Sequence, residues 1–249
     1  MGKKKEEKKE EPPKKKGGCI KKLSLMVLLL LLAYFGLHIF FIWQPAGKPA
    51  DLNKQIMDVN VAGVKLFPAI QAFEIDKIAG RSEVIVGTPI KAQPLKSRLE
   101  NAITNGHQVT FREEEVNVWL SKRLAVKQGG YLAPFVTARA VWVDFKQDEI
   151  ELIIERELPK QQVHMTSLFM RFDRAKNGFS ISRHASQIGQ VKAPGGFARL
   201  IMPSFNSLAT ELAEELKLYK DEAGQLKIYD IKVEEGKITL DPRRPEERK

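Results

Sequence analysis

The hydrophobic pattern begins with an apolar run over residues 23–43, which contains no Asp, Glu, Lys or Arg. As a helix, about 21 residues rising roughly 1.5 Å each extend over roughly 31 Å, the thickness of a membrane's hydrocarbon core. A continuous helix also satisfies every backbone polar group inside lipid. A cleaved signal peptide would have a shorter apolar core, of about 7 to 15 residues. The run therefore predicts an uncleaved transmembrane helix.

The next segment, residues 44–94, has no single periodicity. Pro45, Gly47 and Pro49 indicate a juxtamembrane linker over residues 44–52. Residues 53–80 are mixed, because some apolar positions are spaced as on a helix and others as on a strand. The helix-like positions are Leu66, Ile70, Phe73 and Ile78, and the strand-like ones are Val59, Val61 and Val64. Breakers over residues 87–94 separate this segment from the domain that follows.

Two helices are predicted at the start of that domain. The first covers residues 96–104 and ends at Asn105-Gly106. Thr110 and Glu113 then have the spacing of a capping box, in which each side chain accepts the other residue's backbone N–H. The second helix carries Val116, Trp119, Leu120, Arg123 and Leu124 on one side, and Glu114, Asn117 and Lys122 elsewhere. We expect the first of these sides to be buried.

From about residue 131 the apolar period changes from near 3.6 to two, which is typical of strands. Four strands are predicted, over residues 137–145, 150–157, 163–172 and 179–188. The sequence KQDE at residues 146–149 forms the first hairpin turn, and Asn177-Gly178 is a strong hairpin signal for the last. The pattern predicts an antiparallel meander.

One long helix and two short strands follow the meander. After a break at Pro194-Gly195-Gly196, an amphipathic helix is marked by Leu200, Ile201, Phe205, Leu208, Leu212 and Leu216. Pro203 either kinks this helix or opens its second part. Its solvated side carries Glu211, Glu214 and Glu215. Strands over residues 225–234 and 237–241 precede a charged tail, residues 243–249, which we expect to be frayed.

This order of elements predicts an α+β fold. A single N-terminal transmembrane helix is followed by a curved antiparallel β-meander that packs on a long amphipathic helix. The α+β domain covers residues 95–242, and the 206 residues after the apolar run are enough for one full-sized core.

The distribution of charge predicts how the chain crosses the membrane. Residues 1–22 contain ten Lys and four Glu, which is +6 of the formal net charge of +10. Such a low-complexity segment is expected to be a disordered, basic cytoplasmic tail. The later residues are then extracytoplasmic, in a single-pass protein of the cell inner (cytoplasmic) membrane. Because the other +4 includes no basic run interleaved with aromatic residues, we expect no binding to nucleic acid.

The sequence contains no catalytic or metal-binding motif. Its single cysteine, Cys19, excludes an intramolecular disulfide and a cysteine metal site. The four His residues have no metal-ligand spacing, and no nucleophile elbow, phosphate loop or dinucleotide fingerprint is present. We therefore expect a protein that is not an enzyme and has no metal and no cofactor.

Some polar residues in the strands could suggest a site, but they have simpler interpretations. The pairs Glu149/Glu151 and Glu155/Glu157 have the spacing of one strand face, which favours a solvent-facing row over a catalytic dyad. His164 and His184 would form an ordinary polar pair across the third hairpin.

One strand is apolar on both faces. Val163, Met165 and Phe169 share one face, and Leu168, Met170 and Phe172 share the other. An antiparallel sheet with one wet side should alternate cleanly. Either both faces are covered or one lines an apolar groove, and core packing is the simpler explanation. If a groove exists, the predicted apolar ligand site comprises Trp142, Met165, Phe169 and Phe205.

Residues 109–120, with the sequence VTFREEEVNVWL, resemble an opening motif of small membrane-anchored bacterial envelope proteins. These are the YpmS-like proteins and their LmeA-like, AsmA-related relatives. The meander, the sequence ASQIGQV at residues 185–191 and the closing strand–turn–strand with Gly236 also resemble them, over residues 105–242. The resemblance implies a curved sheet wrapped on a long helix, with lipid or lipid-linked glycan handling at the envelope. It implies no catalytic residues.

Two functions follow as expectations. The first is a membrane-anchored extracytoplasmic binding module that holds a lipid or other apolar ligand at the cell envelope. The alternative is a non-enzymatic structural or assembly protein that binds another envelope protein. A continuous apolar cavity would favour the first, and a filled core with an exposed apolar patch would favour the second.

Overall fold

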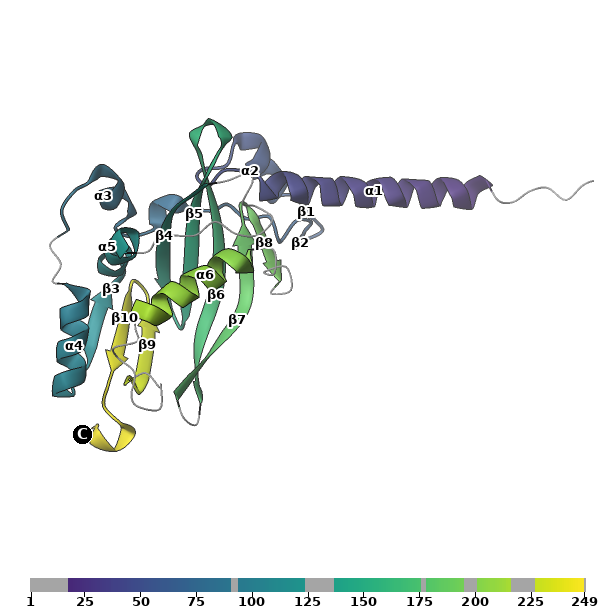
Figure 1. The fold of residues 1–249 in the computed structure, drawn as a ribbon. Coiled ribbons are helices and arrows are strands. Elements are labelled where there is room, and N and C mark those ends of the chain that lie inside the picture. Colours follow the sequence, from purple (N-terminus) through teal and green to yellow (C-terminus); the bar gives the residue numbers. More distant parts are fainter. Residues whose placement is uncertain are drawn as a thin grey trace, which may run out of the picture. The chain divides into compact units, whose positions relative to one another are not determined.

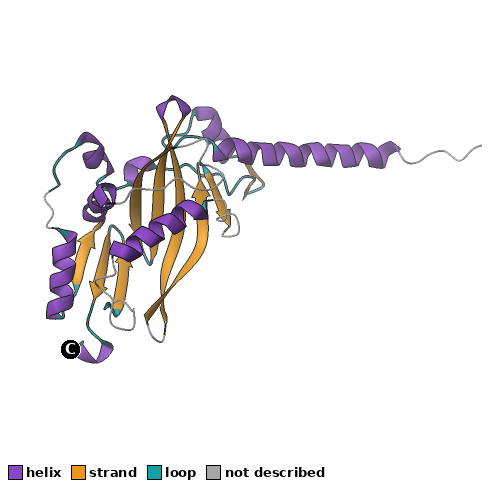
Figure 2. Ribbon diagram, viewed as in Figure 1, coloured by secondary structure: helices purple, strands orange, loops and turns teal. Residues whose placement is uncertain are grey.

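A computed structural model describes residues 18–90, 94–123, 137–175, 178–194, 201–215 and 227–248. The chain divides into two compact units, Met1–Phe40 and Phe41–Lys249. The second unit combines helices with antiparallel sheets, as Figure 2 shows. The predicted α+β class is confirmed at this level.

The apolar run, except for its last residue Trp43, lies within helix α1 (Gly18–Ile42). Its part Lys22–Ile42 is long and apolar enough to cross a membrane. By length and composition this helix fits a membrane anchor or a signal sequence.

The meander is a five-stranded antiparallel sheet in the order β4-β5-β6-β7-β8 (Figure 1). Its strands are β4 (Thr137–Lys146), β5 (Glu149–Leu158), β6 (Gln162–Ala175), β7 (Gly178–Ile188) and β8 (Val191–Pro194). The four predicted strands are confirmed. The sequence did not predict β8, which follows a two-residue turn at Gly189 and Gln190.

A second sheet joins distant parts of the chain in the order β3-β10-β9. Its strands are β3 (Val109–Arg112), β9 (Asp230–Glu234) and β10 (Lys237–Asp241). Helix α4 (Leu95–Asn105) precedes β3, and helix α5 (Glu113–Arg123) follows it directly. The short helix predicted before β3 is thus present.

The predicted capping box is wrong, because Thr110 belongs to a strand. It pairs with Thr239 of β10, and the two hydroxyl oxygens lie 2.8 Å apart. The helix begins three residues later, and Glu115 accepts the backbone N–H of Arg112 at 2.9 Å. The carboxylate of Glu113 therefore does not bind the backbone of Thr110 and instead accepts hydrogen bonds from Ala79 and Phe145.

Both faces of the five-stranded sheet carry buried residues. One face, here called the α6 face, holds Val141, Val143, Leu152, Ile154 and Leu168 in one core cluster. Ile201, Phe205 and Leu208 are buried in the same cluster, and the last two belong to helix α6 (Met202–Glu215), which Figure 1 shows in front of the sheet. Pro203 lies in the first turn of α6, where its missing N–H costs little. Leu200 and Leu216 lie outside the described residues.

The opposite face, here called the loop face, is covered by an irregular segment. Phe73 and Ile78 pack there against Trp142, Ile153 and Met165. In this segment, predicted to be mixed, the helix-like spacing of residues 66–78 marks no α-helix, because these positions lie in loop and in a short 3₁₀ turn, Ile75–Lys77. The two-faced apolar pattern of β6 therefore reflects burial on both sides.

The remaining elements before residue 90 are short. They are α2 (Asp51–Met57), β1 (Asn60–Val61), β2 (Val64–Lys65) and α3 (Arg81–Val86). Strands β1 and β2 form a small hairpin. Residues 69–71 also pair with the outer edge of β8, since Lys192 N–H donates to the Ala69 carbonyl at 2.7 Å. This pairing covers an edge that would otherwise be open to other chains.

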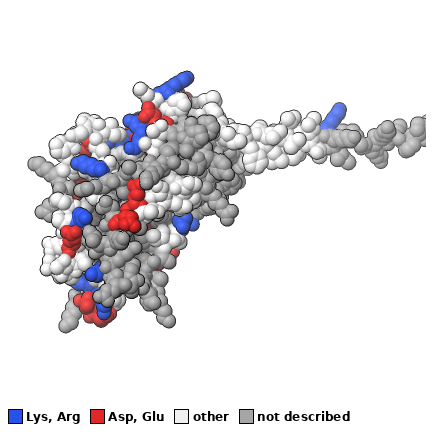
Figure 3. Space-filling model, viewed as in Figure 1, with Lys and Arg blue, Asp and Glu red and all other residues white. Residues whose placement is uncertain are grey.

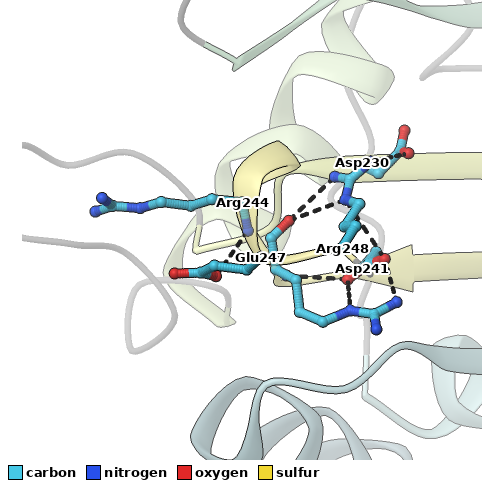
Figure 4. Close-up of polar contacts among 6 residues, drawn as sticks. Asp230, Asp241, Arg244, Glu247 and Arg248 are labelled. Atoms are coloured by element: carbon cyan, nitrogen blue, oxygen red, sulfur yellow. Dashed lines mark hydrogen bonds and ion pairs between the residues drawn. The ribbon is translucent and has the colours of Figure 1, made fainter.

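The C-terminal residues form an ordered ion-pair network (Figure 4). Arg243 donates to both carboxylate oxygens of Asp241, at 3.0 and 2.8 Å. Arg248 reaches Asp230 at 2.6 Å. The prediction of a frayed end is wrong for residues 243–248, because these arginines bind carboxylates on β9 and β10.

Candidate functional site

A cleft of about 290 Å³ opens on the loop face of the sheet. Its lining comes from the loop at residues 71–78 and from strands β4 to β8. Its charged lining residues are Glu74, Lys77, Asp144, Lys146, Glu151 and Lys192, and the aromatic ring of Phe169 lines it as well. Their mixed charge makes this a polar site with an aromatic floor.

Two lysines lie over the ring of Phe169. The Nζ atom of Lys146 is 5.1 Å from the ring centroid, and that of Lys192 is 4.7 Å from it. These distances are within the range of cation–π attraction. The ring is the apolar floor of the cleft, and the two ammonium groups stand above it.

The two lysines differ in their carboxylate partners. Lys146 contacts Glu151 at 2.5 Å and Asp144 at 3.2 Å. Burial alone would lower the pKa of Lys146, but these two carboxylates outweigh it and raise the pKa above its ordinary value. Lys192 has no carboxylate within ion-pair distance among the described residues. It is therefore the lysine best placed to meet an anionic ligand.

The predicted apolar site residues do not share one cavity. Trp142 and Met165 are 1% and 0% exposed and are packed in the loop-face cluster. Phe205 is buried on the α6 face, on the other side of the sheet. Phe169 alone of the four lines the cleft. The sheet separates Phe205 from the other three, which sequence spacing could not reveal.

A buried ion pair lies on the loop face beside these residues. Arg81 donates to both carboxylate oxygens of Glu155, at 3.0 and 3.2 Å, and Trp142 Nε1 donates to the same carboxylate at 2.7 Å. Glu155 is only 2% exposed. The predicted solvent-facing acid row is thus wrong for Glu155 and for buried Glu151, since Arg81 and Lys146 pair with them.

Side chains of helix α5 form hydrogen bonds with backbone N–H and C=O groups at the outer edge of strand β4. Asn117 accepts the Val143 N–H at 2.7 Å and donates to the carbonyls of Val143 and Ala79, both at 2.9 Å. Glu113 accepts the N–H groups of Phe145 and Ala79, at 2.8 and 2.9 Å. Asn117 is fully buried, so its expected place away from the buried side is wrong.

Burial and hydrogen bonding shift the pKa of Glu113 in opposite directions. Desolvation raises the pKa of this carboxyl, and the two backbone N–H donors lower it. Desolvation is the larger effect, so the pKa lies above its ordinary value. The carboxylate nonetheless remains aligned with both donors, which indicates a structural role.

The two strand histidines are not neighbours. His164 pairs with Arg156 on β5, whereas Met170 pairs with Arg183 and Phe169 with Ala185, which leaves His184 at a bulge in β7. The predicted His164–His184 pair is therefore wrong. The hairpin pairs Thr166 with Ile188, so His164 lies near residue 190 in the register, and the one-residue bulge changes this little.

His164 and Arg156 form a buried basic pair instead. Both are 1% exposed. Arg156 donates to the Thr166 hydroxyl, and burial lowers the pKa of its guanidinium to about 10. Burial lowers the pKa of His164 to about 4, with Arg156 acting in the same direction and a hydrogen bond to the Ile42 carbonyl opposing it. The imidazole is therefore neutral at pH 7, and its Nε2 can donate to that carbonyl at 2.8 Å.

We predict that His164 makes the fold less stable in mild acid. The unfolded chain takes up a proton near pH 6.5, but the folded chain does so only near pH 4. Stability is therefore lost as the pH falls through this window, by about 2 kcal/mol at pH 5. Urea unfolding at pH 7.5 and pH 5 should show a smaller loss for His164→Gln than for the wild type. Equal losses would contradict the prediction.

The described residues contain no group of three His, Cys, Asp or Glu side chains that could hold a metal ion. Comparison with protein-family models, with curated proteins and with solved structures finds no match to this chain.

Proposed function

We propose that the protein is a membrane-anchored, extracytoplasmic binding module of the cell envelope and is not an enzyme. The apolar helix α1 is its single-pass anchor in the inner membrane, with the lysine-rich N-terminus in the cytoplasm. The length of Lys22–Ile42 and the +6 charge of residues 1–22 support this topology. In this proposal the curved meander and the amphipathic helix α6 form the scaffold of the binding domain.

The cleft above Phe169 carries the proposal. A site with an aromatic floor and an ammonium group that has no carboxylate partner in the described part of the chain suits a ligand with an anionic group and an apolar part. Its volume of about 290 Å³ is at the lower end for small-molecule sites. We therefore propose that it holds the anionic head group of a lipid, while the acyl chains remain outside.

An anionic lipid head group is a more specific class of ligand than the lipid or other apolar ligand expected from the sequence. Trp142 and Met165 fill the core and leave no continuous apolar cavity with Phe205 among the described residues. Lipid handling is also what the resemblance to the YpmS-like and LmeA-like proteins implies. The head group is the part of a lipid that the charges of the cleft can recognise.

We expect Lys192→Glu to lower lipid occupancy. Native mass spectrometry of the full chain in mild detergent, with added phosphatidylglycerol as the probe, would measure the bound fraction. Lys160→Glu is the matched control, because Lys160 is exposed on a turn away from the cleft lining. Equal occupancy in wild type and Lys192→Glu would refute the cleft as the lipid site.

The alternative is a structural or assembly protein that binds another envelope protein. Two exposed residues on α3 favour it, since Ile85 is 54% and Val86 is 78% exposed. Adjacent exposed aliphatic side chains are typical of a contact surface when they form part of a patch. Cross-linking in membranes that is lost on Ile85→Glu, with lipid binding unchanged, would support this function instead.

A further inference from the structure

Four large aliphatic side chains are exposed shortly after the apolar helix. Leu52 is 66% exposed, Val61 57%, Val64 65% and Leu66 45%. We call these four residues the juxtamembrane patch. Single exposed apolar residues are common, but several within fifteen residues of chain indicate a contact surface.

A tight turn builds the centre of the juxtamembrane patch. Val61 and Val64 are paired across the β1–β2 hairpin, so their side chains share a face. The two turn residues between them, Ala62 and Gly63, have φ of 51° and 85°. Positive φ at both positions is typical of a type I′ turn, which holds the two valines together.

Hydrogen bonds hold helix α2 near the end of the apolar run. Asn53 Nδ2 donates to Gln44 Oε1 at 3.1 Å, and Gln44 N–H donates to the Phe41 carbonyl at 3.3 Å. All of these residues belong to the second compact unit. Leu52 is therefore close to the point where the chain leaves the apolar segment.

The charges around the juxtamembrane patch suit an anionic lipid surface. Three exposed lysines, Lys48, Lys54 and Lys65, and two exposed acids, Asp51 and Asp58, each lie within four residues of a patch residue in the sequence. Three cations and two anions leave a net charge of +1. Apolar side chains flanked by lysines are typical of segments that lie in the headgroup region, since the lysine stems can reach outward to the phosphates.

We propose that the juxtamembrane patch inserts into the extracytoplasmic headgroup region of the membrane. The inference rests on the proposed function, because it requires α1 to span the bilayer. The hairpin would then give the domain a second attachment to the membrane. Such an attachment restricts how the domain turns about its anchor, which keeps the cleft at a defined orientation to the lipid surface.

A depth measurement on the full chain tests this proposal. In a Cys19→Ser background, Val64→Cys carries an environment-sensitive fluorophore, and Ile181→Cys is the control, since Ile181 is a 55%-exposed aliphatic residue of β7. The proteins are reconstituted in vesicles of phosphatidylcholine and phosphatidylglycerol. We expect the label at residue 64 to be quenched several-fold more by nitroxide lipids, and several-fold less by aqueous iodide, than the label at residue 181.

The outcomes separate the two proposals. Extraction of the protein from the vesicles by alkaline carbonate would refute the membrane anchor. If the anchor is retained but both labels respond alike, the insertion of the patch is overturned. Protection of residue 64 from iodide without quenching by nitroxide lipids would also overturn it, because the patch would then be covered by protein. A Val61→Glu/Val64→Glu pair should reduce the lipid quenching of a label at Leu66→Cys.

Discussion

Replacing Glu155 with alanine is expected to lower the free energy of unfolding by about 3–5 kcal/mol. The change leaves the guanidinium of Arg81 and the indole N–H of Trp142 without their shared acceptor on the loop face. The two charged side chains are only 11% and 3% exposed, so water does little to replace the lost carboxylate. Urea unfolding of the full chain in mild detergent, followed by tryptophan fluorescence, would measure the loss.

The same strand offers a matched control. Glu157 lies two residues further along β5 and contacts Arg139 at 3.6 Å, with both side chains about 40% exposed. Because exposed ion pairs contribute little, Glu157→Ala should cost less than about 1 kcal/mol. Similar losses for Glu155→Ala and Glu157→Ala would contradict the assigned role of the buried pair.

A double-mutant cycle distinguishes the interaction energy between Arg81 and Glu155 from the effects of side-chain packing. Arg81→Met and Glu155→Gln each leave one partner buried without its counter-charge. In the double variant the charge is gone from both positions, and glutamine can still accept the Trp142 N–H. We expect the double variant to lose less stability than the sum of the two singles, by about 0.5–3 kcal/mol.

The second large loss of folding stability is expected on replacement of Asn117. Asn117→Ala removes the partners of the Val143 N–H, the Val143 carbonyl and the Ala79 carbonyl. Since each buried polar group left unpaired costs about 1–3 kcal/mol, we expect a loss of about 3 kcal/mol or more. Hydrogen exchange should also become faster along β4, because its outer edge would be open.

Two further variants test whether the hydrogen bonds of the Asn117 side chain account for this loss of stability. Asn117→Asp keeps the acceptor for Val143 N–H but removes both donors, so it should be as damaging as alanine. Lys122→Ala, at an exposed position of the same helix, should change stability by less than about 0.5 kcal/mol. If Asn117→Ala behaves like Lys122→Ala, the side chain does not hold the strand.

The local pattern of hydrophobic and turn residues predicted those helices and strands whose conformation depends on residues nearby in the sequence. The four long strands, the helix at α4 and strand β10 lie within a few residues of their predicted positions. Strand periodicity and turn residues are local, so they can be read from the chain. The alternation in β6 likewise assigned Met165 and Leu168 correctly to opposite faces.

Long-range pairing overrode local pattern elsewhere. Thr110 looked like a helix cap, but its strand is completed by Thr239, which is 129 residues away in sequence. Residues 66–78 looked partly helical, yet they cover the loop face without forming a helix there. In both segments the burial gained against a distant strand decided the conformation, and propensity did not.

The sequence by itself determined the apolar helix, the basic N-terminus and the meander, because each depends on composition or on local period. Only the tertiary structure decided which polar side chains are buried and what they bind. Glu155 meets Arg81 and Asn117 meets Val143 across 74 and 26 residues of chain. The same is true of the cleft, where Lys192 and Lys146 converge on Phe169 from β8 and β4. The buried carboxylate of Glu155 is stabilised by the guanidinium of Arg81, and folding alone brings these two charges together.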